Sequence, residues 1–77
     1  MIRRDYHNTS LEDALRDADD AIAYVRMNAL HHESAEDAEF VVGHGVIRNE
    51  LIKLLHSRGL YPREQLGNSG VIVCVIQ

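Results

Sequence analysis

The sequence predicts an α/β fold, a two-layer sandwich in which two helices pack on one face of a mixed β-sheet in the order β-α-β-α-(β)-β. Three observations predict it: short strand-like segments alternate with two helical patterns, capping residues mark the helix ends, and the last segment is apolar on both alternating sets of side chains. Right-handed crossovers place both helices on the same face. A chain of 77 residues has room for one small core, so we expect residues 1–77 to form a single domain.

The first strand is expected at residues 2–7, IRRDYH, and a long helix follows it. Thr9 is expected as the N-cap of this helix, with Glu12 at position N3 completing a capping box. One apolar stripe then repeats at helical spacing, formed by Leu11, Leu15, Ala18, Ile22, Val25 and Ala29. The polar segment HHESAED, residues 31–37, ends the helix or forms the next connection, and we interpret His31, His32 and Glu33 as a solvated helix end rather than a metal site.

The second helix is expected over residues 46–60, after a short strand AEFVVG at residues 38–43 and the turn Gly43-His44-Gly45. Its predicted apolar side consists of Val46 or Ile47 with Leu51, Leu54 and Leu55. Gly59 suits the left-handed C′ position and Leu60 the C″ position, which predicts a Schellman cap.

The last strand is expected at residues 71–77, after a turn-rich loop with a short edge strand around Leu60 and Tyr61. Because both of its side-chain sets are apolar, it belongs in the middle of the sheet. Two helices cover only one face, so we expect the other face to be exposed. A homodimer interface is the plainest candidate for it, and the alternative is that this face is simply small. Cys74 lies inside this apolar strand and is expected to be a small buried hydrophobe rather than a nucleophile.

Composition and charge narrow the class of protein. The chain has neither a run of about 18 apolar residues nor an apolar stretch behind its basic start, so we expect a soluble cytoplasmic protein without a membrane partner. The net charge of −4 is uneven, because residues 9–39 sum to −7 and the remainder to +3. The remainder therefore predicts a modest basic face toward phosphates, unless both regions are ordinary solvated faces. The run Asp17, Asp19 and Asp20 is interpreted as a solvent face, with phosphate mimicry as the alternative.

Asp5 and His7 are the first candidate catalytic residues. In a strand, positions i and i+2 share a face with Cα atoms about 6–7 Å apart, so this carboxylate is placed to orient the imidazole as a general base or acid. The same spacing fits two ligands of a metal site, although no third ligand is evident, and a D-x-H motif also arises in purely structural settings.

Gly43, His44, Gly45 and Arg48 form the second candidate group. A strand, a Gly-x-Gly turn and a helix start let the backbone approach a phosphate, and Arg48 in the first helical turn adds a cation. If the first two strands are parallel, this group and His7 lie at the same carboxyl edge of the sheet, where α/β folds place their sites. A plain tight turn remains the alternative.

The order and spacing of these motifs resemble the Smr (small MutS-related) domain family over nearly the whole chain. RDYHNTSLEDAL resembles the family's L-D-x-H-G start and helix at Asp5, His7, Leu11, Glu12, Ala14 and Leu15. FVVGHGVIRNELIKLL supplies the glycines of its H-G-x-G or T-G-x-G signature, and GNSGVIVCVIQ is similar to its closing strand. The chain departs from the pattern at Arg4 for Leu, Val42 for His or Thr, His44 for Lys or Arg, and Asn8 for Gly, where Asn tolerates positive φ.

The resemblance implies nucleic-acid binding and endonucleolytic cleavage of DNA or RNA. His7, oriented by Asp5, is expected to act as general base or acid, while the Gly43–Gly45 backbone, His44 and Arg48 hold the phosphate. We expect no metal or cofactor, and a metal-free reaction favours RNA because its 2′-hydroxyl is an internal nucleophile. The alternatives are a catalytically inactive nucleic-acid- or protein-binding module and a homodimeric interaction protein.

Overall fold

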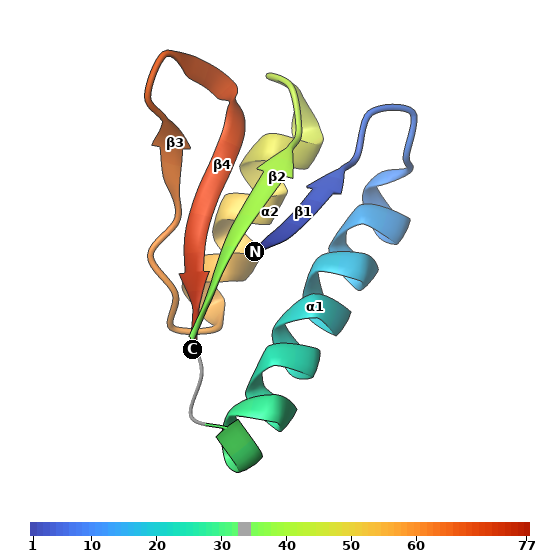
Figure 1. Ribbon diagram of the computed structural model, residues 1–77. Helices are drawn as coiled ribbons and strands as arrows, with labels where there is room; N and C mark the ends of the chain where they lie inside the picture. The colour runs from blue at the N-terminus through green and yellow to red at the C-terminus, as the bar shows by residue number, and fades with distance from the viewer. Residues whose placement is uncertain (33–34) are drawn as a thin grey trace.

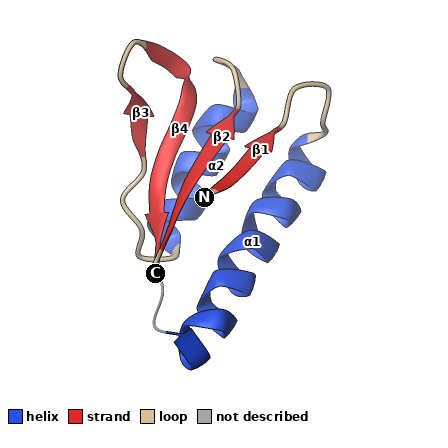
Figure 2. Cartoon of the chain, in the orientation of Figure 1, coloured by secondary structure: helices blue, strands red, loops and turns tan. Residues whose placement is uncertain are grey.

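The computed structural model describes residues 1–32 and 35–77, and no side chain is described for residues 29–32. The elements run in the predicted order: β1 (Ile2–Asp5), α1 (Leu11–His32), β2 (Glu36–Val41), α2 (Val46–Ser57), β3 (Arg63–Gln65) and β4 (Asn68–Ile76). Both helices lie against a four-stranded mixed sheet (Figure 2). The predicted fold is confirmed. No helix of the described chain is long and apolar enough to cross a membrane.

The sheet has the strand order β1-β2-β4-β3. β1 is parallel to β2, with Asp5 opposite Val41, whereas β4 is antiparallel to both of its neighbours. The last strand is therefore internal, as its apolar sequence predicts. The short edge strand is β3, and the expectation of a strand around Leu60 and Tyr61 is wrong. Leu60 still belongs to the cap of α2, so the chain joins the sheet only at Arg63, which lies opposite Val73.

The start of α1 lies one residue later than predicted, because Ser10 and not Thr9 is its N-cap. The Ser10 Oγ accepts the Asp13 N–H at 3.1 Å, which places Asp13 and not Glu12 at N3. Thr9 belongs to the preceding turn, where its N–H donates to the Tyr6 carbonyl at 3.1 Å. The predicted capping box is therefore wrong, and Glu12 pairs with Arg16 one turn further along the helix.

The buried face of α1 is rotated relative to the predicted stripe. Leu11 is 37% exposed and Leu15 only half-buried, whereas two alanines outside the stripe are buried. The buried residues of α1 are Ala14, Ala18, Ala21, Ile22 and Val25. Small side chains let the helix approach the sheet closely, and Leu15 still packs against the edge of the core. Ala29, the last residue of the predicted stripe, has no described side chain.

α2 ends as predicted, in a Schellman cap. Gly59 has φ +77°, its N–H donates to the His56 carbonyl at 3.0 Å, and the Leu60 N–H donates to the Leu55 carbonyl at 3.0 Å. The regular helix stops at Ser57, and the cap occupies the following residues. Leu51 and Leu55 are fully buried, while Val46 at the start of the helix is 62% exposed.

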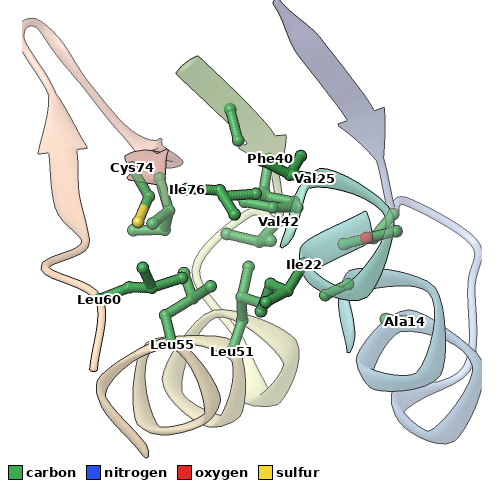
Figure 3. Packing of buried hydrophobic residues seen from close by; sticks show 14 residues of the cluster. Ala14, Ile22, Val25, Phe40, Val42, Leu51, Leu55, Leu60, Cys74 and Ile76 are labelled. Carbon is green, nitrogen blue, oxygen red and sulfur yellow. The ribbon is translucent and has the colours of Figure 1, made fainter. Parts of the chain in front are cut away.

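One hydrophobic cluster joins the helices to the sheet (Figure 3). Phe40 and Ile76 project from the sheet toward Ile22 of α1 and Leu51 of α2. Cys74 belongs to this cluster as predicted, and burial raises the pKa of its thiol. Apart from the Tyr6 hydroxyl and the Cys74 thiol, no polar or charged side chain is buried in the described part of the chain.

The face of the sheet away from the helices is open. Val73 and Val75 of β4 lie on it, and Val75 is 40% exposed. The neighbouring positions of β1 and β2 carry Arg3 and Glu39, whose side chains form an ion pair at 2.7 Å. An exposed second face is therefore confirmed, and its use in a homodimer stays a prediction.

Candidate functional site

Tyr6 fixes the end of β1 and the start of the turn that carries His7. Its N–H donates to the Val41 carbonyl at 2.9 Å, which extends the β1–β2 pairing by one residue. Its ring is buried and stacks on Phe40, with centroids 6.0 Å apart. Its hydroxyl donates to Asp17 Oδ2 at 2.7 Å. Burial and this neighbouring carboxylate raise the pKa of Tyr6, so its hydroxyl stays a proton donor.

Asp5 and His7 contact each other, but through a turn rather than along a strand. β1 ends at Asp5, and Asn8 takes φ +60° in the turn that follows, as Asn at that position predicts. Asp5 Oδ1 accepts the backbone N–H of His7 at 3.0 Å and lies 2.8 Å from His7 Nδ1. The bonds from the His7 backbone N–H and then from its ring hold the pKa of Asp5 below its ordinary value.

This contact orients the imidazole. With Nδ1 donating to the carboxylate, His7 Nε2 carries the lone pair of the neutral ring. The His7 side chain is 74% exposed, so Nε2 is open to a ligand from solution. An oriented imidazole with an accessible nitrogen is the arrangement that a general base requires.

The Gly43-His44-Gly45 turn follows the end of β2. Gly43 has φ +67°, and its N–H and that of Val42 donate to the Gly70 carbonyl at 3.0 and 2.9 Å. Gly45 is the N-cap of α2 and offers no side chain to the first-turn N–H groups. Val42, where the Smr pattern has His or Thr, is 9% exposed and belongs to the hydrophobic cluster, so it is not a site residue.

His44 and Arg48 are held by the β3–β4 hairpin. His44 Nε2 lies 2.7 Å from Ser69 Oγ, and Arg48 Nε donates to the Ser69 carbonyl at 3.1 Å. Arg48 Nη2 also forms an ion pair with Glu64 Oε1. The predicted cation is therefore present at the turn, but a carboxylate neutralises it. Sequence reasoning missed Ser69 and Glu64, because only the pairing of β4 with β2, which are distant in the sequence, brings this hairpin to α2.

The two candidate groups lie at the same edge of the sheet. β1 and β2 are parallel, and both the His7 turn and the Gly43–Gly45 turn leave their carboxyl ends (Figure 1). The Tyr6 N–H bond to Val41 joins the two ends directly. Within the described residues no side-chain hydrogen bond or ion pair links the Asp5–His7 pair to His44 or Arg48. The site thus has two neighbouring halves rather than one closed cluster.

The predicted basic face is not formed as the charge count suggests. Most basic side chains outside residues 9–39 pair with a carboxylate, in the ion pairs Arg3–Glu39, Arg4–Asp17, Arg48–Glu64, Lys53–Glu50 and Arg58–Asp19.

The acidic run of Asp17, Asp19 and Asp20 is likewise more than a solvent face. Asp17 binds Tyr6 and Arg4, Asp19 holds Arg58 by two hydrogen bonds of 2.9 Å, and Asp20 alone is exposed.

Metal binding has no support at the described residues, which contain no group of three or more His, Cys, Asp or Glu side chains placed to hold an ion. The Asp5–His7 pair accordingly has no third ligand among them. Glu33 lies outside the described residues, and so do the side chains of His31 and His32.

No protein-family model matches the sequence, and neither the curated proteins nor the solved structures contain a match. The likeness to Smr domains therefore depends on the motifs of the chain itself.

Proposed function

We propose that this chain is an Smr-like nucleic-acid-binding domain that cleaves RNA, with His7 as the general base. The observation that carries the proposal is the 2.8 Å contact between His7 Nδ1 and Asp5 Oδ1 beside an exposed Nε2. The pair lies at the carboxyl edge of two parallel strands, next to a Gly-x-Gly turn and an uncapped helix start.

The proposed reaction is a transesterification within the RNA. His7 Nε2 takes the proton of a 2′-hydroxyl, whose oxygen forms a bond to the adjacent phosphorus. The bond from phosphorus to the 5′-oxygen breaks, that oxygen takes a proton from water, and the hydroxide left behind takes the proton from His7 and restores the neutral ring. The products are a 2′,3′-cyclic phosphate and a 5′-hydroxyl end. Asp5 stabilises the imidazolium that forms, because its carboxylate accepts a hydrogen bond from the Nδ1–H of His7.

The second half of the site supplies groups for the phosphate. His44 in its protonated form, the backbone N–H groups at the start of α2, and Arg48 when released from Glu64 are the donors available to phosphate oxygens. DNA lacks the 2′-hydroxyl, so we propose that it binds to the same edge without being cleaved.

The test is cleavage of a labelled single-stranded RNA and of the DNA of the same sequence, with and without a chelator. His7→Ala should lower the RNA cleavage rate by about 10² to 10⁴, the usual contribution of a general base. His56→Ala is the matched control, because His56 is an exposed histidine in the last turn of α2 and should leave the rate unchanged. Equal cleavage by His7→Ala and the wild type would refute the proposal.

A binding module without catalytic activity is the second candidate, and the Arg48–Glu64 pair favours it. A guanidinium already neutralised by a carboxylate stabilises the charge of a transition state less than a free cation does. This candidate predicts RNA and DNA binding with no cleavage of either, and with equal affinity for wild type and His7→Ala.

A further inference from the structure

We propose that Glu64 competes with the phosphates of the nucleic acid for Arg48 and so limits the affinity of the phosphate-binding half of the site. The Glu64 carboxylate forms an ion pair with the guanidinium of Arg48, so a phosphate that binds Arg48 must displace this carboxylate. The inference rests on the proposed function, because it assumes that Arg48 receives a phosphate of the nucleic acid. Sequence patterns gave Glu64 no role.

The position of Arg48 is fixed by neutral acceptors as well as by Glu64. Its Nε donates to the Ser69 carbonyl at 3.1 Å and its Nη1 reaches Asn49 Oδ1 at 3.4 Å, while Nη2 contacts Glu64. The Arg48 side chain is only 19% exposed. Removal of the Glu64 charge therefore leaves the guanidinium at the start of α2, and its Nη2 is then available to a phosphate oxygen.

Glu64 can leave Arg48 without disturbing the core. It lies on β3, an edge strand of three residues whose register with β4 shifts between Glu64 and Gln65. The Glu64 side chain is 52% exposed, so its carboxylate can rotate into water. A planar guanidinium binds a carboxylate or a phosphate in the same fork geometry, so the two anions compete for one partner.

This competition sets how many contacts a ligand needs at this edge. A carboxylate and a phosphodiester each carry one negative charge, so exchanging one for the other at Arg48 gains little by itself. A polymer that reaches His44 and the start of α2 with neighbouring phosphates gains further contacts, and these drive the exchange. Glu64 therefore lowers the affinity of every phosphate that uses Arg48, and a ligand with further contacts at this edge overcomes that competition.

The experiment compares the binding of a single-stranded RNA oligonucleotide to the wild type and to Glu64→Gln by fluorescence anisotropy. The Glu64 carboxylate is half-exposed, so its pair with Arg48 opposes exchange only weakly, and Glu64→Gln should bind RNA about two- to fivefold more tightly. Asp20→Asn is the matched control, because it removes the same charge from an exposed position with no ion pair among the described residues. It should bind like the wild type.

A double-variant cycle identifies the partner. The gain from Glu64→Gln should vanish in an Arg48→Gln background, since no guanidinium is then left to release. If Glu64→Gln binds no more tightly than Asp20→Asn, or keeps its gain without Arg48, this inference is overturned while RNA binding and cleavage by the wild type still stand. If neither the wild type nor any variant binds RNA, the proposed function fails and the inference fails with it.

Discussion

A few residues fix the environment of His7, the candidate general base. The D-x-H spacing predicts that Asp5 and His7 meet, and they do, although in a turn that the carboxylate itself stabilises through the His7 N–H. Tyr6 appeared in the sequence only as the residue between them. Its anchoring of the turn to Val41, Phe40 and Asp17 could not be predicted, because each of those partners is distant in the sequence.

Replacement of Asp5 by Asn tests whether the carboxylate orients a base or only closes a turn. The amide keeps an acceptor for the His7 N–H but cannot stabilise an imidazolium, so RNA cleavage at neutral pH should fall about tenfold, part of the 10² to 10⁴ contributed by a general base. RNA affinity should stay within about twofold, because electrostatic binding depends mainly on the cations that meet phosphates. A rate equal to the wild type's would show that Asp5 is structural.

Asp5→Asn also tests the hydrogen bond between Asp5 and the His7 N–H at acidic pH. The folded-state pKa of Asp5 is lowered below 3.8, so the contact with His7 contributes stability above pH 3.8 and loses it as the pH falls through that lower value. The chemical shift of the His7 amide proton should therefore move in the wild type below pH 3.8 and stay flat in Asp5→Asn. Parallel titration of both proteins would contradict the assigned hydrogen bond.

At the scale of elements, the sequence predicts best where the partners are close in the chain. The Schellman cap of α2 depends on bonds between residues three and five apart, and it was predicted residue by residue. The N-cap of α1 was misplaced by one residue, because Thr9 and Ser10 are both good caps and only the turn at Tyr6 decides between them. β3 was misplaced because its position follows from pairing with β4.

Gly59→Ala tests the C-terminal cap of α2. A Cβ at Gly59 would meet no atom within 4 Å, so the cost is that of a left-handed backbone at φ +77° alone. We expect the free energy of unfolding to fall by about 1–2 kcal/mol, measured by urea denaturation. Gly59→Asn should lose clearly less, because Asn tolerates positive φ. An equal loss in both variants would indicate that the backbone conformation is not the cause.

At the scale of the whole molecule, ion pairs between different elements decide where charge is neutralised, and the net charge of a sequence segment does not. The sum of +3 outside residues 9–39 predicted a basic face, yet Arg3, Arg4 and Arg58 each pair with a carboxylate on another element. A charge count along the chain cannot show this, since it does not contain the contacts that folding creates. These pairs connect β1 to β2, β1 to α1, and the end of α2 to α1.

The pairing predicts a weak dependence of RNA binding on salt. Arg48, once released from Glu64, and His44 are the two side chains that the Gly43–Gly45 edge offers a phosphate backbone. Two phosphate contacts to a single strand give a slope of log K against log salt of about −1.4. The measurement is anisotropy of labelled RNA over a series of salt concentrations at pH 6, with Arg48→Gln expected to reduce the slope by about 0.7. A slope near about −4 would require the ion pairs between the elements to open on binding, and would contradict the edge as the only contact surface.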